Sequence, residues 1–405
     1  MLSTLIYRSR LKGDIDQAGL EAIVRQAQTR NAQMQVSGIL VFDGHQFLQV
    51  LEGPLHSVEA LFERISLDAR HDFVVELMRD YAPRRHFENV GMALFDLRYV
   101  KAHTVLKAVV KSSVVPFNLA REARVYQFIR SFLRRQDNLP ISRQFNPDAW
   151  RVDAPPPPTP PTPTVVPAVA DIACQFALQP IVEPTTCKIK AYEALIRSPE
   201  GGSPAALFAS LSSKALYDLD LHSKEIAFAL AKAVNIGSQM ISVNLLPGSL
   251  VQCPNAVEIL LAQIARQGLL PQQVIVEVTE SEVISRFDEF ECVIRQLRAA
   301  GINLAIDDFG AGFAGLSLLT RFQPGRIKID RCIVADIHLH GPKQAIVHGI
   351  IRCCAELEIT VVAEGVEKVE EWCWLEAAGI KYFQGYLFAR PLVNCAPTVS
   401  WPTAR

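Results

Sequence analysis

The sequence predicts an α+β ferredoxin-like domain followed by an α/β barrel of the TIM, or (β/α)8, type. Three observations predict this. A chain of 405 residues is long enough for two or three domains of about 150 residues each. Residues 154–167 contain eight prolines in fourteen positions, which favours an extended spacer over a packed core. Apolar runs and helical spacing alternate on both sides of this spacer, in two different orders. We therefore expect a first domain at 1–97, a helical connector at 98–153, a linker at 154–168 and a barrel at 169–405.

The first domain is built from short elements. Strands are expected at residues 2–7, 36–42, 46–51, 73–79 and 89–95, and helices at 16–31 and 57–66. Asp43 and Gly44 separate the second and third strands, which is a strong hairpin signal. The β-α-β-β-α-β-β order indicates a ferredoxin-like layer. Residues 99–135 are expected to be helical and to cap this layer or lead away from it.

The second domain alternates strand-like and helical segments over about 230 residues. Its eight apolar runs are FALQPIV, IKAYEALI, MISVNLLP, VIVEVTE, INLAIDDF, RIKID, ITVVAEGV and KYFQGY. Eight units of this size are the number that closes a TIM-type barrel.

Composition excludes several classes of protein. The chain is 49% hydrophobic and 20% charged, and no run of about 18 apolar residues occurs, so we expect no membrane-spanning helix. Apolar residues precede basic ones at the N-terminus, the wrong order for a secretory signal, so we expect a cytoplasmic protein. The nine cysteines include no CxxC pair, which favours reduced thiols over disulfides or a zinc site.

Basic residues are concentrated in one segment of a chain whose formal net charge is −1. Residues 98–143 hold ten Lys and Arg against two acidic residues. This segment is either a solvated helical face or a surface that docks on the acidic C-terminal half or on nucleic acid. Neither half of the chain is basic enough overall to indicate DNA binding, so we expect no nucleic-acid partner and no membrane.

Polar residues lie within or at the C-terminal ends of the strands of the second domain. They are Glu193, Asn244, Glu277, Asp307, Asp308, Lys328, Glu364 and Gln384. Interior polar groups are costly unless they are paired or bind metal, and strand C-termini converge on one face of a barrel. Oxygen ligands without nearby His or Cys indicate Mg²⁺ or Mn²⁺. Several carboxylates can hold two ions about 3.5–4 Å apart, as in a phosphoester hydrolase.

Two features of this region have alternative interpretations. Lys328 alternates with two isoleucines, so we expect it to point inward, where it would orient or deprotonate water or screen a phosphate. The alternative is a salt bridge to one of the acids. Residues 310–315, GAGFAG, also match a dinucleotide-binding pattern, but Asp307 and Asp308 just before the glycines would repel a pyrophosphate.

This set of residues resembles the EAL-domain cyclic di-GMP phosphodiesterases. The resemblance covers about 172–395, and its motifs are, in order, Gln179-Pro180, Tyr192-Glu193-Ala194-Leu195-Ile196-Arg197, Val243-Asn244-Leu245, Glu277-Val278-Thr279-Glu280, Asp307-Asp308-Phe309-Gly310, Lys328-Ile329-Asp330, Ala363-Glu364-Gly365-Val366-Glu367 and Gln384-Gly385. It implies hydrolysis of cyclic di-GMP to linear pGpG by a two-metal mechanism.

The same resemblance implies a role for each residue. One metal ion would be held by Glu193, Asn244, Glu277 and Asp307, and the second by Asp307, Asp308 and Glu364, with Asp307 bridging the two. The catalytic set would be Lys328, Glu364 and Gln384, with Lys328 and Gln384 placing the water. Substrate would be contacted by Gln179, by Leu195 at a guanine and by Arg197 at a phosphate. Glu280 would brace the loop at 308–318.

A polar side chain interrupts an apolar strand of the first domain. The two-residue period places Gln49 on one face with apolar neighbours, where an unpaired amide costs about 1–3 kcal/mol. Tyr7 lies on an apolar face of its own strand, and Asn31 ends the first helix, where it could be a simple C-cap. Each residue is explained by structure alone, but together they indicate a planar polar ligand between the two helices and the sheet.

These residues resemble the BLUF blue-light sensor domain over about 1–95. The matching segments are Leu5-Ile6-Tyr7-Arg8-Ser9, Arg30-Asn31, Ser37-Gly38-Ile39-Leu40 and Phe47-Leu48-Gln49-Val50-Leu51-Glu52-Gly53. The resemblance implies a bound flavin, FAD or alternatively FMN, contacted by Tyr7, Asn31 and Gln49, with Met92 in the family's late-strand position. Arg64, Asp68 and Arg70 are further candidates for its ribityl and phosphate end. Val90 stands where many members carry Trp.

Together the two resemblances imply a BLUF–EAL photoreceptor enzyme, that is, a blue-light-regulated cyclic di-GMP phosphodiesterase. We expect a homodimer with light acting across its interface. Two alternatives stay open. One is a non-catalytic, light-modulated cyclic di-GMP receptor, and the other is an active barrel whose flavin domain is too weakly coupled to matter.

Overall fold

The computed structural model divides the chain into two compact units. The first is Met1–Ile141 with Asp336–Ile346, and the second is Ser142–Ala335 with Val347–Arg405. The structure describes residues 2–13, 15–82, 85–87, 91–112, 124–133, 146–153, 168–169, 172–200, 202, 207–209, 211–279, 287–311, 319, 324–357 and 359–404.

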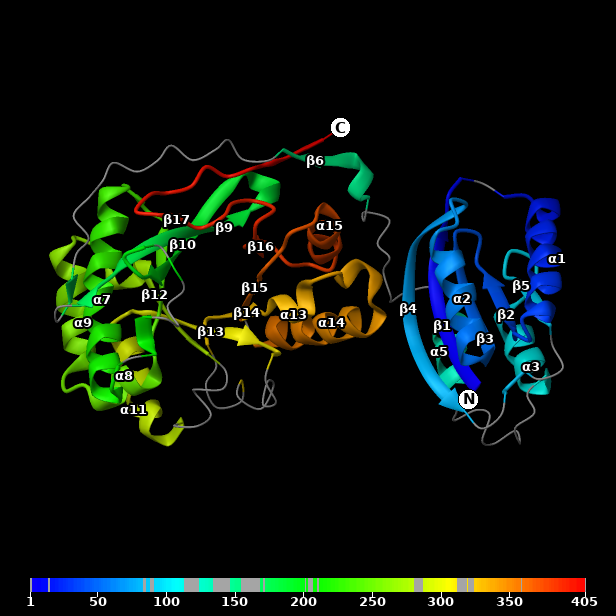
Figure 1. The fold of residues 1–405 in the computed structure, drawn as a ribbon, viewed down its shortest axis with the longest axis horizontal. Coiled ribbons are helices and arrows are strands. Elements are labelled where there is room, and N and C mark those ends of the chain that lie inside the picture. Colours follow the sequence, from blue (N-terminus) through cyan, green and yellow to red (C-terminus); the bar gives the residue numbers. More distant parts are fainter. Residues whose placement is uncertain are drawn as a thin grey trace. The chain divides into compact units, whose positions relative to one another are not determined.

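The first unit is built on a five-stranded sheet (Figure 1). Its strands are β1 (Leu2–Leu11), β2 (Ser37–Phe42), β3 (Gln46–Pro54), β4 (His71–Ala82) and β5 (Met92–Asp96), in the spatial order β4-β1-β3-β2-β5. Neighbouring strands are antiparallel except β2 and β5, which are parallel. This confirms the predicted ferredoxin-like layer, with β5 added beside β2.

Alternation along the strands gives this sheet two apolar faces. On one face, Leu5, Tyr7 and Phe47 pack with residues of α1 (Gln17–Gln33) and α2 (Leu55–Ser66). On the opposite face, Ile6 and Leu48 pack with residues of α3 (Ala102–Ser112) and α5 (Arg124–Leu133). Successive strand residues point to opposite faces, which places the hydroxyl of Tyr7 between the sheet and the first two helices.

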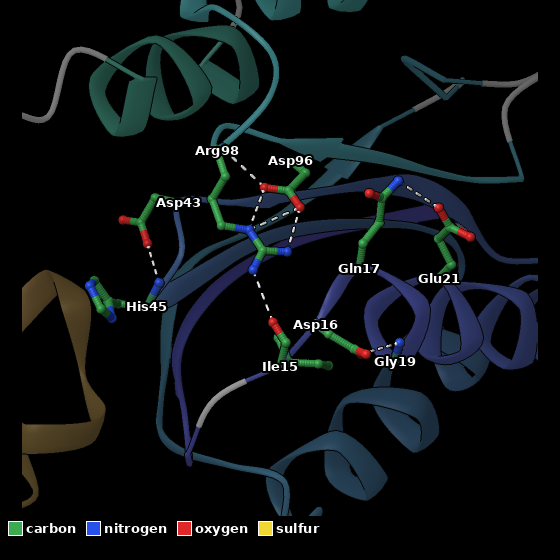
Figure 2. Close-up of polar contacts among 9 residues, drawn as sticks. All are labelled: Ile15, Asp16, Gln17, Gly19, Glu21, Asp43, His45, Asp96 and Arg98. Atoms are coloured by element: carbon green, nitrogen blue, oxygen red, sulfur yellow. Dashed lines mark hydrogen bonds and ion pairs between the residues drawn. The ribbon is translucent and has the colours of Figure 1, made fainter.

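The start of α1 is fixed to the end of β5 (Figure 2). Asp16 caps the helix, because its Oδ1 accepts a hydrogen bond from the Gly19 N–H at 2.8 Å. Arg98, just beyond β5, donates to both carboxylate oxygens of Asp96 and, through Nη1, to the Ile15 carbonyl at 2.9 Å. These contacts hold the loop before α1 against the sheet edge.

The second unit contains a closed barrel of eight strands (Figure 1). They are β9 (Gln175–Glu183), β10 (Lys188–Arg197), β11 (Met240–Asn244), β12 (Val274–Thr279), β13 (Asn303–Phe309), β14 (Arg326–Ile329), β15 (Thr360–Ala363) and β16 (Tyr382–Phe383). Strands β10 to β16 pair in parallel, and β9 closes the ring between β16 and β10. All eight runs predicted as strands form the barrel, which confirms the predicted fold class.

The first strand of the barrel runs against the others. β9 is antiparallel to both β10 and β16. The chain passes from β9 to β10 through one short turn, η2 (Pro184–Thr186), and a tight connection can only join antiparallel strands. The two strands therefore form a hairpin where the sequence suggested a β/α unit. A further short strand, β17 (Leu392–Val393), pairs with β9 from outside the ring.

Helices cover the barrel between its strands (Figure 1). They are α7 (Ser213–Ala233), α8 (Pro247–Gln252), α9 (Ala256–Arg266), α11 (Phe287–Ala299), α13 (Arg331–Val334), α15 (Val369–Ala377) and α14 (Gly341–Glu356), which belongs to this unit from Val347 on. In the described part of the chain, none of the helices has both the length and the apolar character that crossing a bilayer requires. The nine cysteines are free thiols; Cys187, Cys292 and Cys332 are exposed, whereas the sequence suggested thiols in the core.

The residues before the proline-rich run belong to the second unit. β6 (Trp150–Val152) pairs antiparallel with β18 (Pro402–Ala404) near the C-terminus. The Trp150 ring packs edge-on against Trp372 of α15, with ring centroids 5.3 Å apart. The chain after the run returns in β7 (Ala168–Val169) of the same unit. Residues 146–153 are thus part of the barrel unit, whereas the sequence suggested a connector there.

Candidate functional site

The acidic residues predicted to form a site come together inside the barrel. Glu193, Glu277 and Asp307 lie on β10, β12 and β13, and Asn244 ends β11 between the first two. Parallel pairing sets Asn244 opposite Glu277. Glu193 and Glu277 are 4% and 0% exposed, so neither carboxylate meets bulk water. The remaining members, Glu364 and Gln384, directly follow β15 and β16.

A bulge in β13 allows two consecutive aspartates to serve the site. The register of β13 with β14 shifts between Ile306 and Phe309. Asp308 within this bulge has φ of 53°, in the left-handed region that a non-glycine residue rarely adopts. In a regular strand Asp307 and Asp308 would point to opposite faces, but a bulge re-aims one side chain. One carboxylate oxygen of each lies within 4.8 Å of one another and of a Glu364 oxygen.

Lys328 lies at the centre of the carboxylates. Its Nζ is 2.7 Å from Glu277 Oε2, 2.5 Å from Glu364 Oε1, and 3.2 Å from both Glu193 Oε2 and Asp307 Oδ1. The lysine is 1% exposed and points inward from β14, as predicted. It forms four ion pairs at once, more than the single salt bridge of the alternative interpretation.

Amides complete the polar network on the other side of Glu193. Glu193 Oε1 accepts from Asn244 Nδ2 at 2.7 Å, and Glu193 Oε2 accepts from Gln384 Nε2 at 2.6 Å. Gln384 also donates to Gln179 Oε1 at 3.1 Å, and Gln179 donates to the Ala389 carbonyl. Both oxygens of Glu193 are therefore held in fixed positions by neighbours from three strands.

Burial and charge shift the acidities of the group. Burial would lower the pKa of Lys328, but the surrounding carboxylates raise it well above its ordinary value. Burial raises the pKa of Glu277 to about 8 and that of Glu364 well above its usual range. Burial acts in the same sense on Glu193, but Lys328 and the two amides outweigh it and lower the pKa of that carboxyl. Its four acidic neighbours thus favour the ammonium form of Lys328.

The donor set fits hard divalent cations. Two trios of carboxylates, Glu193–Glu277–Asp307 and Asp307–Asp308–Glu364, each bring ligand atoms within 4.8 Å of one another and share Asp307. All their donors are oxygens, which suits Mg²⁺ or Mn²⁺. Among the described residues, Glu277 Oε1 and Gln384 Oε1 are buried acceptors without a hydrogen-bond partner. A buried oxygen of this kind is costly unless a cation or a donor satisfies it.

A cavity of about 280 Å³ opens beside the carboxylates. It is lined by Asn244, Glu277, Asp307 and Asp308 and by two of the residues expected to contact substrate, Leu195 and Arg197. Burial lowers the pKa of Arg197, and its Nη1 donates to the neighbouring Ile196 carbonyl at 2.9 Å. An arginine beside a cluster of buried acids has remaining donors for a phosphate. Glu280, which was expected to brace the neighbouring loop, lies outside the described residues, as do 312–318.

The first unit holds a second cavity, between its sheet and the helices α1 and α2. This cavity of about 240 Å³ has apolar walls that include Leu40, Leu61 and Ile65. Its polar lining includes six of the seven residues predicted to bind a flavin, namely Tyr7, Asn31, Gln49, Arg64, Asp68 and Arg70. A cavity with apolar walls and a few convergent polar groups is typical of a cofactor site.

Three of the predicted residues form a hydrogen-bonded row in this cavity. The Tyr7 hydroxyl donates to Gln49 Oε1, and Gln49 Nε2 contacts Met92 Sδ at 3.3 Å. Met92 is the seventh predicted residue and lies behind Gln49, away from the cavity lining. Asn31 is 1% exposed, and its Nδ2 has no partner among the described residues. A buried donor that faces a cavity fits a ligand carbonyl such as those of an isoalloxazine ring.

Charged residues gather at one end of the same cavity. Arg70 donates to both carboxylate oxygens of Asp68, which lowers the pKa of Asp68 to about 2. His71 and Arg30 also line the cavity, and sequence reasoning gave neither a role. Arg30 precedes Asn31 on α1, and His71 follows Arg70 at the start of β4. Their position next to predicted residues was the one signal that the sequence offered for them. Val90, at the position where many members carry Trp, lies outside the described residues.

The fold and the two sites define a modular class of protein, in which an α+β sheet with a flavin-like cavity precedes a carboxylate-lined barrel. Family models agree: the EAL domain matches residues 168–391, and the BLUF family, described as sensors of blue light using FAD, matches residues 2–93. The chain belongs to the BLUF–EAL family.

Relatives and solved structures place the chain within that family. It is 45% identical over 403 residues to the blue light- and temperature-regulated antirepressor BluF of Escherichia coli K12, which covers 99% of both chains. It is 40% identical over 117 residues to the cyclic di-GMP phosphodiesterase PdeR of the same organism, 29% of this chain and 18% of that protein. The structure matches Klebsiella pneumoniae BlrP1 in complex with calcium and cyclic di-GMP, with a TM-score of 0.93, 46% identity and 100% coverage of both chains. BlrP1 has also been solved with FMN and cyclic di-GMP.

Proposed function

We propose that this chain is a blue-light-regulated phosphodiesterase that hydrolyses cyclic di-GMP to linear pGpG. The observation that carries the proposal is the pair of carboxylate trios that share Asp307 beside a cavity lined by Arg197. The position of the chain in a family with cyclic di-GMP phosphodiesterases and cyclic di-GMP complexes supports the choice of substrate.

In this proposal the carboxylates hold two divalent cations. Glu193, Asn244, Glu277 and Asp307 surround one position, and Asp307, Asp308 and Glu364 the other. When bound, the cations supply an activated water and neutralise charge on the phosphodiester. Arg197 would hold a phosphate oxygen of the substrate, and Leu195 lines the same cavity. Gln179 does not line this cavity but accepts a hydrogen bond from Gln384 beside it.

Lys328 and Gln384 act as orienting groups in the proposed mechanism. Lys328 Nζ lies within 2.5–3.2 Å of oxygens of four carboxylates that would also hold the cations. As an ammonium it would donate hydrogen bonds to a water and balance charge beside the phosphate. Gln384 has a free buried Oε1 with which to accept from the attacking water. Glu364 belongs to the catalytic set that the family resemblance implies, and we assign it to take the proton of that water.

Light control would begin at the Tyr7–Gln49–Met92 row. A flavin in the cavity would supply the absorption of blue light, and the ribityl and phosphate end of FAD or FMN would lie toward Arg64, Asp68 and Arg70. The Gln49 amide has two orientations with different donors and acceptors, so it can store the state of the domain. The α3 and α5 helices pack on the opposite face of the same sheet and would carry that state onward.

The deciding experiment is chromatography of the nucleotides after incubation of purified protein with cyclic di-GMP and Mg²⁺ or Mn²⁺, in darkness and under blue light. Formation of pGpG at a faster rate in light supports both parts of the proposal. Equal rates would leave an enzyme with an uncoupled flavin domain. No pGpG in either condition would reject the enzyme.

The sensor has its own test in Gln49→Leu. This variant should bind flavin but lose the light-induced red shift of its absorbance, because leucine cannot exchange hydrogen bonds. Gln17→Leu is a matched control, since Gln17 bonds only to Glu21 on the exposed face of α1 among the described residues. A normal red shift in Gln49→Leu would contradict the switch role.

A non-catalytic receptor is the second candidate function. The relative BluF is named an antirepressor, which describes a binding role. Binding of cyclic di-GMP without turnover in the experiment above would favour this candidate. We also propose a homodimer, which light scattering of the purified protein in darkness and light would test.

A further inference from the structure

A second buried charged pair lies in the cavity of the barrel, apart from the metal-binding carboxylates. Asp220 and Lys224 are one turn apart on α7, and Lys224 Nζ is 2.7 Å from Asp220 Oδ1. Their side chains are only 6% and 3% exposed. Both residues line the same cavity as Arg197, Asp307 and Asp308.

Asp220 has a structural role that accounts for one of its oxygens. Its Oδ2 accepts from the Leu246 N–H at 2.9 Å and from the Ser249 hydroxyl at 2.6 Å. These two bonds tie α7 to the segment that follows Asn244. Neither bond needs Lys224, because neutral donors already satisfy this oxygen.

Lys224 has no comparable structural explanation. Among the described residues, Asp220 is its hydrogen-bond partner, although an ammonium has three donors. Burying such a pair rarely adds stability over an apolar pair of similar size, because desolvation offsets the attraction between the charges. Two donors of a 97%-buried side chain are therefore available to whatever enters the cavity.

The walls around Lys224 suit a flat aromatic ring. Phe176 lies below the ammonium, with its ring centroid 6.0 Å from Nζ. Leu195, Phe208 and Leu246 supply the rest of the apolar lining, while Arg197 and the carboxylates lie elsewhere in the same cavity. The chamber thus has an apolar part with one cationic donor beside a part suited to a phosphodiester.

We propose that Lys224 is a specificity-determining residue that donates hydrogen bonds to the O6/N7 edge of a guanine base of the substrate, with Asp220 holding the ammonium in place. This inference rests on the proposed function. Guanine presents two acceptors, O6 and N7, on that edge, whereas adenine replaces O6 by an amino group that is itself a donor. An ammonium at this position therefore accepts guanine and opposes adenine.

The test compares cyclic di-GMP with cyclic di-AMP on the full chain with Mg²⁺. Lys224→Met keeps the length of the side chain and removes the donor. We expect kcat/KM for cyclic di-GMP to fall at least about tenfold, mainly through KM, while kcat/KM for cyclic di-AMP does not fall. Lys190→Met is the matched control, because Lys190 pairs with Glu183 outside this cavity and should leave both values unchanged.

A second variant covers the case in which Lys224→Met does not fold. The double variant Asp220→Asn with Lys224→Met is neutral and keeps an oxygen for the Leu246 N–H, and it should show the same loss of discrimination. If either folded variant keeps the wild-type ratio, or loses the same factor with both nucleotides, Lys224 is not a specificity residue. If the wild type hydrolyses neither nucleotide, the proposed enzyme fails, and calorimetric dissociation constants for the two nucleotides replace kcat/KM in the comparison. A wild type that binds neither nucleotide, or both equally, would overturn the inference.

Discussion

At the scale of single residues, the centre of the barrel holds more negative than positive charge. One ammonium, that of Lys328, faces four carboxylates at distances of 2.5–3.2 Å. Burial raises the pKa of Glu277 to about 8, and the nearby carboxylates of Glu193 and Asp307 act in the same sense, against Lys328. Further positive charge would stabilise the ionised form of the whole group. Two divalent cations are the charge that the proposed reaction needs in the same place.

The role of Glu193 in that group is directly testable. Glu193→Gln keeps the shape and one acceptor oxygen but removes the charge, so hydrolysis of cyclic di-GMP should fall by more than about 100-fold. The absorbance of the bound flavin should not change, because Glu193 belongs to the other unit. Initial rates of pGpG formation measure the effect. Glu183→Gln, at a partly exposed ion pair with Lys190, serves as control, and wild-type rates in Glu193→Gln would remove this residue from the metal site.

The hydroxyl of Tyr7 gives a prediction about pH. Burial, and after it the Asp68 carboxylate, raise the pKa of Tyr7 above its ordinary value of 10. A phenol whose pKa is higher in the folded state contributes stability that is complete below pH 10 and is lost as the pH rises further. In ultraviolet titrations of folded protein, wild type and Tyr7→Phe should therefore show the same phenolate absorbance up to about pH 11. An extra phenolate in the wild type near pH 10 would contradict this.

At the scale of elements, the bulge in β13 decides how the site is presented. A strict two-residue period places Asp307 and Asp308 on opposite faces, so periodicity alone could not have put both in one site. Their joint placement came from their position at the C-terminal end of the strand, and the family motif gave both a role as metal ligands. The register shift with the left-handed Asp308 gives the physical basis. By contrast, Glu193, Glu277 and Lys328 lie on regular strands, and for Lys328 alternation predicted the inward direction correctly.

Gly310 lets the chain leave this bulge. Its φ is 92°, and an added Cβ would lie 2.4 Å from the Ile333 Cδ1 atom. Gly310→Ala should therefore destabilise the protein by about 1–3 kcal/mol and slow hydrolysis, because relief of the strain moves Asp307 and Asp308. Thermal unfolding and rate measurements test both effects. Gly349→Ala on α14 is the control, since its Cβ meets nothing within 4 Å and alanine favours helices. If Gly310→Ala kept the stability and the rate of the wild type, the backbone conformation at Gly310 would not be needed to position Asp307 and Asp308.

At the scale of the whole molecule, the barrel strands could be predicted from the sequence, but the direction of β9 and the pairing of β6 with β18 could not. All eight barrel strands carry strong apolar runs, and each was predicted. The antiparallel direction of β9 depends on the short turn at η2, whose length the apolar pattern does not report. The pairing of β6 with β18 joins residues about 250 positions apart, and a strand of three residues has too little periodicity to be recognised.

The chain on both sides of the proline-rich run is fixed to one unit, by β6 before it and β7 after it. Insertion of a flexible Gly/Ser segment of the same length into residues 154–167 should therefore leave hydrolysis and the ratio of light to dark rates unchanged. Doubling the length of a flexible loop adds only about 0.6 kcal/mol to the cost of closing it. Rate measurements in darkness and light, with thermal unfolding, would check this. A changed ratio would show that the run takes part in signalling.

This anchoring also bears on how the sequence can evolve. A segment that sets the spacing of two modules is under selection for its length, because each inserted or lost residue changes how one module regulates the other. A loop whose two ends are fixed to the same body is under much weaker constraint. We therefore expect orthologues to differ in the number of prolines here more freely than in the residues of β6 and β18, where an insertion would put Trp150 out of register with the C-terminal strand.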